Sequence, residues 1–448
     1  MWMPAGGRNG RSYRQKENIM SKKSHITAGY DFGDNVPVKV RYIFRGTAFG
    51  PEEVKAVREA FKGGTLTMGP QVEAFEKEFA RYVGAKHAFA VTSCTTAMHV
   101  VVQMLGIGPG DEVIVTPNTF VATSLGIVKE GGTPVFADID PRTFNISAAE
   151  IEKKITPRTK AIFVVHYGGQ CCDMDGIMEI SRKHNIPVME DCAHALGSKF
   201  KGQHAGTFGV AGCWSFHSLK NITTGGEGGM ITINDERWIE PIKMLRCINI
   251  REWRDEDARR IMNEQGLTKN AEEYWLPSHF DVEDVQGKWG MNYRMNEIQA
   301  AIGRVQLKKL KGFVKRRREC GHYLNEHLRG IPGITPVYED PRCFHCFHLY
   351  TLCVEEEELG ATRDEFMRVL YYEEGIQGIQ HYQPTYDLTG FRKLGQKPHQ
   401  CPAAEKFFYH RETNLPMHPM LKQRDLEAIV TGIKRAAEKV RGRQAKVA

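Results

Sequence analysis

Lys220 is the residue whose surroundings point most directly to chemistry. It follows the apolar run Cys213 to Phe216 and precedes a loop, Gly225 to Gly229, that contains four glycines. This pattern predicts a turn at a strand end, which is where ligands bind in α/β folds. A deprotonated lysine amine there is a nucleophile that forms a Schiff base with an aldehyde. A surface lysine beside a glycine turn is the alternative, because the motif is not specific by itself.

Asp191 and His194 follow a second apolar run, IPVME at 186–190. A carboxylate at a buried strand end needs a partner, because an unpaired buried charge is costly. The functional interpretation of Asp191 is a counter-charge for a cationic ring nitrogen. The structural alternative is the N-cap of a short helix.

A small polar turn, formed by Ser93, Cys94 and Thr95, joins a predicted strand at 87–92 to a helix. A strand, a small-residue turn and a helix together aim backbone N–H groups at a phosphate. An ordinary helix N-cap would look the same. Phe120 follows another predicted strand end, where its ring either stacks on a flat ligand or packs in the core.

These features together are what a protein must supply to pyridoxal 5'-phosphate: a Schiff-base lysine, an acid for the pyridine nitrogen and a phosphate cradle. Asp191 would keep the ring nitrogen protonated. Lys220, once released, would move protons as general base and acid.

The elements that position these residues alternate, which predicts an α/β fold with a mostly parallel sheet. A long amphipathic helix is predicted at 289–317, and a smaller α+β domain follows it. The predicted division is a flexible arm at 1–45, a large domain at 46–310 and a small domain at 311–448. The expected strands are 87–92, 112–116, 134–138, 161–165, 186–190, 348–354 and 376–382. The expected helices are 51–63, 71–83, 119–130, 147–155, 173–184, 363–375, 403–412 and 424–440, with a charged helical region at 235–262 and an irregular insertion at 254–288.

The composition excludes several classes of protein. The net charge of +7 lies largely near the two ends of the chain, which does not favour a nucleic-acid partner. An apolar run long enough to span a membrane is missing from the sequence. Eleven cysteines without a regular framework favour reduced thiols in a cytoplasm. The C-x-x-C spacing of Cys343 and Cys346 lacks a second matching pair, so core cysteines are favoured over a metal site.

The chain resembles the DegT/DnrJ/EryC1/StrS sugar aminotransferases over about residues 46 to 435. The segments that carry the resemblance include TMGPQVEAFEKEFA, SCTTAMH, GDEVIVTPNTFVAT, VVHYGGQCCDMD, EDCAHALGSKFKG, the Lys220 stretch, GMNYRMNEIQAAIG and LPMHPML. The resemblance implies the aspartate aminotransferase fold of pyridoxal-phosphate-dependent transferases. It also implies a homodimer with each site at the subunit interface.

The resemblance also implies roles for individual residues. Lys220 matches the Schiff-base lysine, Asp191 the carboxylate on the pyridine nitrogen, and Phe120 the stacking ring. Other cofactor positions fall on Ser93, Cys94, Thr95, His194, Ser215 and, reaching from the neighbouring subunit, Asn292. The sugar is expected at Thr67, Met68, His381 and Tyr382. Many relatives have glycine at the position of Cys94. One branch of the family replaces the lysine with histidine and dehydrates sugars, and Lys220 argues against that branch.

The expected activity is amino transfer from L-glutamate or glutamine to a keto sugar, expected to be a nucleotide-linked keto-deoxyhexose, in amino sugar or polysaccharide biosynthesis. An aminotransferase for a ketocyclitol and a non-catalytic regulator that kept the fold are the alternatives. The sugar, the aminated carbon and the role of the 254–288 insertion are left open by the sequence.

Overall fold

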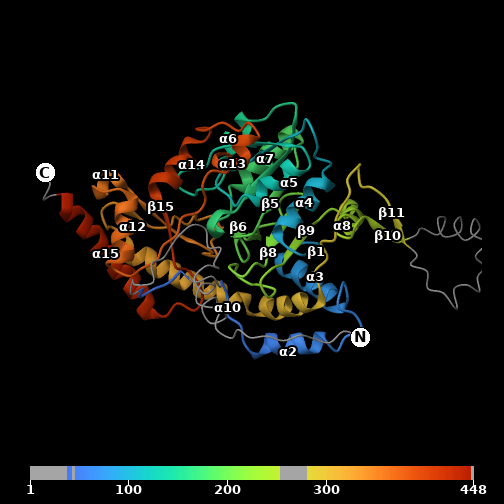
Figure 1. Cartoon of the computed structure of the whole chain (residues 1–448), viewed down its shortest axis with the longest axis horizontal. Coiled ribbons are helices and arrows are strands. Elements are labelled where there is room, and N and C mark those ends of the chain that lie inside the picture. The colour runs from blue at the N-terminus through green and yellow to red at the C-terminus, as the bar shows by residue number, and fades with distance from the viewer. Residues whose placement is uncertain (1–37, 43–45, 253–279, 445–448) are drawn as a thin grey trace, which may run out of the picture. The chain divides into compact units, whose positions relative to one another are not determined.

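A seven-stranded sheet, in the order β1-β9-β8-β5-β4-β2-β3, is the centre of the fold (Figure 1). Its strands are β1 (His87–Val91), β2 (Glu112–Val115), β3 (Thr133–Phe136), β4 (Thr159–Val165), β5 (Val188–Asp191), β8 (Ala211–Ser215) and β9 (Gly229–Ile233). β2, β3, β4, β5 and β8 pair in parallel, whereas β9 is antiparallel to both of its neighbours. The mostly parallel sheet is therefore confirmed. β9 is the exception because the chain returns from β8 through the Lys220 loop, without a crossover helix.

The computed structural model describes residues 38–42, 46–252 and 280–444, and Val38–Ala448 is one compact unit. The arm predicted at 1–45 and the insertion predicted at 254–288 lie mostly outside the described residues. Two short strands, β10 (Ile250–Glu252) and β11 (Phe280–Val282), pair antiparallel where the described chain stops and resumes. The helical region predicted at 235–262 is helical from Glu236 to Leu245. No helix among the described residues is long and apolar enough to cross a membrane.

Both faces of the sheet are buried, which explains why its strands are continuous apolar runs in the sequence. On β2, Val113 and Val115 belong to one core cluster and Ile114 to the other. The first cluster includes residues of α4 (Cys94–Met104), α5 (Ala122–Lys129) and α8 (Ile239–Leu245), and the second those of α3 (Pro70–Val83), α7 (Met174–His184) and α10 (Glu297–Leu328).

The long helix α10 begins at Glu297, eight residues later than the predicted start. Asn296 ends the extended segment before it, because its side chain accepts a hydrogen bond from the backbone N–H of Gln299 at 2.8 Å. The Gln299 side chain in turn accepts from the backbone N–H of Asn296, which completes a capping box. α10 packs against α2 (Pro51–Ala60), α3 and the C-terminal helix α15 (Gln423–Gln444) (Figure 1).

The C-terminal part contains a three-stranded antiparallel sheet with a core cluster of its own. The sheet order is β12 (Ile334–Thr335), β14 (Tyr350–Val354) and β15 (Glu412–Leu415). The strand predicted at 376–382 is wrong, since Ile376 and Ile379 form only isolated bridges. The helix predicted at 403–412 is shorter: α14 (Pro402–Lys406) leads into a π-helical turn that ends where β15 begins. The remaining elements are α6 (Ala148–Lys153), α11 (Glu356–Leu359), α12 (Arg363–Tyr372), α13 (Thr389–Lys393), β6 (Lys199–Phe200), β7 (Gln203–His204) and β13 (Cys343–Phe344).

Candidate active site

Lys220 lies in the turn between β8 and β9, where it borders a small cavity. His381 and Tyr382, two of the predicted sugar residues, line the same cavity, so the structure brings three of the predicted residues together. His348 and Tyr42 also line it. Neither of these two residues was predicted from the sequence.

The Lys220 amine is adapted for nucleophilic chemistry by its surroundings. Burial lowers its pKa to about 8, while the nearby Asp191 and Cys94 act in the opposite direction. A lysine with this pKa carries an appreciable neutral fraction near neutral pH, and only the neutral amine can attack an aldehyde.

Covalent attachment of pyridoxal 5'-phosphate to the cofactor-free protein should accelerate as pH rises through about 8, because Lys220 loses its proton there rather than near 10.5. Stopped-flow absorbance at pH 6.5 to 10.5 measures the rate. The Lys220→Ala variant is the control, because it removes the amine and should abolish this pH dependence. A midpoint near 10.5 would contradict the lowered pKa.

Asp191 ends β5 as a buried carboxylate with three hydrogen-bond donors. Thr123 Oγ1 donates to its Oδ2 at 2.8 Å, and the Ala193 N–H donates to its Oδ1 at 3.0 Å. The Cys94 thiol lies 3.9 Å from the same Oδ1. Burial raises the pKa of Asp191, and the two stronger hydrogen bonds oppose that rise. A buried carboxylate oriented in this way suits a cationic N–H group better than solvent. Sequence reasoning missed Thr123, which lies on the first turn of α5.

The predicted phosphate turn lies at the N-terminus of α4. Ser93 caps this helix, because its Oγ accepts from the Thr96 N–H at 3.2 Å. Gly229 pairs with Val91 of β1 on one side and with Ser215 of β8 on the other, which places Ser215 near the turn. A Cβ on Gly229 would lie 2.3–2.7 Å from backbone atoms of Ser93 and Cys94, so only glycine permits this approach. Thr95 is exposed.

His194, Tyr382 and Phe120 surround the same region. The Gly168 N–H donates to His194 Nδ1 at 3.3 Å, which leaves the hydrogen on Nε2 to donate to the Tyr382 hydroxyl oxygen, also at 3.3 Å. Burial, followed by the charge of Lys220, lowers the pKa of His194 well below its ordinary value. The Phe120 ring is 59% exposed and meets Tyr382 edge-on at 6.1 Å. Phe120 is therefore not a core residue, and its free face suits stacking on a flat ligand.

Three predicted residues lie away from the Lys220 cavity within this chain. Thr67 is exposed and bridges to Asn296, and Met68, with a φ of 48°, forms the turn before α3. Asn292 is exposed beside Cys247, with which it forms a bridge. Their roles toward sugar and phosphate stay predictions, and for Asn292 the prediction already required a neighbouring subunit.

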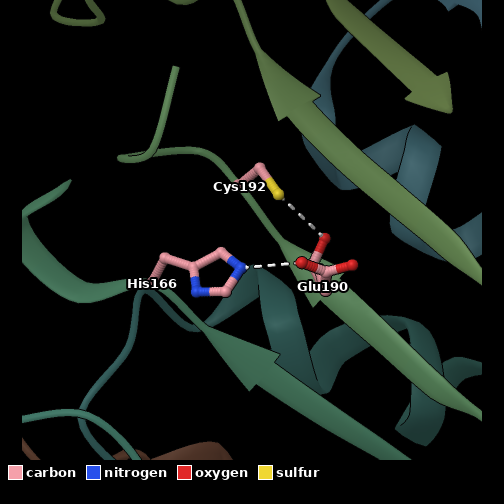
Figure 2. A group of neighbouring side chains, drawn as sticks. All are labelled: His166, Glu190 and Cys192. Atoms are coloured by element: carbon pink, nitrogen blue, oxygen red, sulfur yellow. Dashed lines mark hydrogen bonds and ion pairs between the residues drawn. The ribbon is translucent and has the colours of Figure 1, made fainter. Parts of the chain in front are cut away.

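A second cluster, His166, Glu190 and Cys192, has the residue types of a metal site (Figure 2). Its ligand atoms are already engaged. The Cys172 N–H donates to His166 Nδ1 at 3.0 Å, so Nε2 carries the hydrogen and donates to Glu190 Oε2 at 3.0 Å. The Glu190 carboxylate also accepts from the backbone N–H groups of residues 206, 208 and 209 at 2.7–2.8 Å. Burial raises the pKa of the Cys192 thiol, which keeps it protonated. Through the Glu190 carboxylate, this cluster holds the 206–209 loop against β5.

Glu190→Ala should lower the free energy of unfolding by about 3–5 kcal/mol, because it leaves three buried or partly buried backbone N–H groups and the buried His166 without their acceptor. Urea unfolding followed by tryptophan fluorescence measures the change. Glu179→Ala, on the exposed face of α7, is the matched control and should be nearly neutral. A melting temperature that zinc raises in the wild type but not in Glu190→Ala would instead identify a metal site.

The C-x-x-C cysteines do not converge. The Cys343 thiol faces the Cys171 carbonyl oxygen at 3.7 Å, whereas Cys346 Sγ lies 3.2 Å from the His194 carbonyl oxygen and accepts from Asn221 Nδ2. Cys346 thus packs behind the Lys220 site, as a core cysteine would. All eleven cysteines are free thiols.

The described residues fit pyridoxal 5'-phosphate. Lys220 supplies the amine, Asp191 a buried carboxylate, Phe120 an exposed ring, and the turn at Ser93 a helix N-terminus. The arrangement can bind an aldehyde covalently, hold a cationic ring nitrogen and anchor a phosphate.

Comparison with known proteins agrees with this chemistry. Residues 48–434 match the model of the DegT/DnrJ/EryC1/StrS aminotransferase family. The spore coat polysaccharide biosynthesis protein SpsC of Bacillus subtilis is 39% identical over 391 residues, which cover 86% of this chain and 94% of that protein. GDP-perosamine synthase of Caulobacter vibrioides is 37% identical over 368 residues, which cover 82% of this chain and 90% of that protein. A putative sugar aminotransferase of Streptococcus pneumoniae, solved in a PMP form, has a TM-score of 0.78 at 28% identity and covers 89% of this chain and 100% of its own.

Proposed function

Because this chain belongs to the DegT/DnrJ/EryC1/StrS aminotransferase family, whose members are pyridoxal-phosphate-dependent enzymes, we propose that it aminates a nucleotide-linked keto-deoxyhexose. L-Glutamate or glutamine is the proposed amino donor, and Lys220 the Schiff-base lysine. The observation that supports this most directly is the pairing of two groups at neighbouring strand ends. These are the Lys220 amine, with its pKa lowered to about 8, and the buried Asp191 carboxylate.

The bound cofactor would act as an electron sink for charge that develops on the substrate carbon. The protein residues would hold and orient it. The Asp191 carboxylate, fixed by Thr123 and the Ala193 N–H, would keep the pyridine nitrogen protonated. The Ser93 turn, with Ser215 beside it, would bind the phosphate, and Phe120 would cover one face of the ring.

Lys220 would then carry the proton between the two carbon atoms that exchange it. A general base works best when its pKa lies near the working pH, and a value of about 8 meets that condition. His194, held neutral by burial, would orient the Tyr382 hydroxyl rather than carry charge itself.

We also propose a homodimer with shared sites. Trp289 and Met291 are 59% and 55% exposed, and they immediately precede the exposed Asn292. Large apolar side chains in one exposed segment are typical of a subunit interface. The free thiols support a reducing compartment such as the cytoplasm.

Incubation of the purified enzyme with glutamate and a panel of nucleotide-linked keto sugars tests the activity, with the amine product detected by mass. One aminated sugar in the panel is the expected result. Amination of ketocyclitols alone would replace the proposed substrate with a cyclitol. A protein that stays colourless with added cofactor would favour the non-catalytic alternative. The same assay with glutamine distinguishes the two donors.

A further inference from the structure

Two residues near the start of the described chain supply part of the Lys220 cavity wall. Tyr42 and Gly46 both line the cavity, and Tyr42 is half-buried. The match to the family model begins only at residue 48. This part of the wall therefore lies outside the residues that the family model matches.

The chain just before Tyr42 is tied to the segment that precedes the predicted sugar residues. The N–H groups of Lys39 and Val40 donate to the Gly375 carbonyl at 2.8 and 3.2 Å. The Val40 carbonyl accepts from the Gln377 N–H at 3.1 Å, and the Tyr42 N–H donates to the Gln377 side-chain oxygen at 2.9 Å. Tyr42 is thereby held in register with residues 375–377, a few residues before His381.

Gly46, the next described residue after Tyr42, is tied to the Lys220 loop. Its N–H donates to the Ser218 carbonyl at 2.8 Å, and its own carbonyl accepts from the buried guanidinium of Arg317 at 2.6 Å. A Cβ on Gly46 would lie 2.1–2.3 Å from the carbonyl oxygens of residues 219 and 220, so glycine is required for this contact. The backbone hydrogen bonds of Lys39, Val40 and Tyr42 to residues 375–377 therefore hold Tyr42 at the wall, and Gly46 meets the same wall from the Lys220 loop.

A tyrosine in this position suits a carbohydrate. Its ring offers a flat apolar face for the C–H side of a sugar, and its hydroxyl offers both a donor and an acceptor. Burial raises the pKa of Tyr42 above its ordinary value, so the hydroxyl keeps its proton. His381 and Tyr382, the proposed sugar residues, line the same small cavity.

We propose that Tyr42 is a specificity-determining residue that contacts the sugar substrate. This inference rests on the proposed function, since it assumes that a keto sugar enters the Lys220 cavity. Tyr42 is not assigned to the amino donor or to the cofactor, so its replacement should affect the sugar half of the reaction selectively.

Steady-state kinetics of Tyr42→Ala with glutamate and a GDP-linked keto-deoxyhexose test the proposal. We expect the KM for the sugar to rise about tenfold, which corresponds to about 1.4 kcal/mol. The KM for glutamate and the visible absorption of the bound cofactor should not change. Tyr42→Phe, which keeps the ring, should raise the sugar KM less. Tyr372→Ala, at an exposed tyrosine on α12, is the matched control.

Calorimetric binding of the same sugar gives a readout without turnover. The sugar should bind Lys220→Ala about ten times more tightly than it binds the double variant Lys220→Ala/Tyr42→Ala. Equal binding by the two variants, or equal rises in both KM values, would overturn the role of Tyr42. A wild-type enzyme that binds the sugar through Tyr42 but never converts it would overturn the proposed reaction and leave the Tyr42 contact standing.

Discussion

Lys220→Ala loses at least about 10⁴-fold in turnover, because one substitution removes both the covalent attachment point of the cofactor and the group that moves the proton. The visible absorption of the attached cofactor disappears with it. Absorbance spectroscopy and single-turnover kinetics with glutamate measure the two effects.

The folded state should tolerate this change. The Lys220 side chain is half-buried at a cavity, and its amine has no hydrogen bond in the described structure that the substitution would break. Lys308→Ala, at an exposed position of α10, serves as the control and should keep both activity and absorption. Retained turnover in Lys220→Ala, with correct folding shown by circular dichroism, would end the assignment of Lys220.

Asp191→Asn should lower kcat about 10²- to 10³-fold while the cofactor stays bound. Asparagine has the shape of aspartate, and its one carbonyl oxygen can still accept from the Ala193 N–H while its NH2 group faces Thr123, but it has no negative charge. The ring nitrogen would lose the partner that keeps it protonated, so the developing charge on the substrate carbon would be less well stabilised.

A graded series separates the charge of Asp191 from its orientation. Thr123→Val removes one hydrogen bond to Oδ2 and leaves the carboxylate, so we expect a loss of about tenfold. The rate of proton transfer, followed with glutamate deuterated at the α carbon, reports the affected step. An unchanged rate in Asp191→Asn would remove Asp191 from its assigned role.

Much of the candidate site could be predicted because its residues follow strands that are buried on both faces. Such strands stand out as short apolar runs, and Lys220, Asp191 and Ser93 lie within a few residues of their ends. Asp191 and Lys220 meet at one edge of the sheet because β5 and β8 pair in parallel, and Ser93 joins them because β9 is antiparallel to both β1 and β8. The start of α10 was missed because residues 289–296 share the apolar content of the helix, and the boundary depends on the Asn296 cap.

The rest of the cavity wall could not be predicted, because its contacts join distant segments. Tyr42, Gly46 and His348 come from opposite ends of the chain, and no local pattern distinguishes them from ordinary residues. The buried Arg317 resembled one more basic residue in a charged helix, although its guanidinium binds backbone carbonyls from three separate segments. Asn292, in contrast, was predicted from the sequence, but a single chain cannot test its role because that role depends on a second subunit.

The contacts of the Arg317 guanidinium also bear on the order in which the parts of the enzyme can fold during synthesis. It donates to the carbonyls of Gly46, His348 and Met417, so the cavity wall closes only after a residue near the C-terminus has been synthesised. All seven strands of the central sheet have been synthesised by residue 233, but the α10 residues that cover one of its faces follow only after residue 296. The Lys220 segment thus precedes, in the order of synthesis, both the helix that buries its sheet and the residues that complete its pocket.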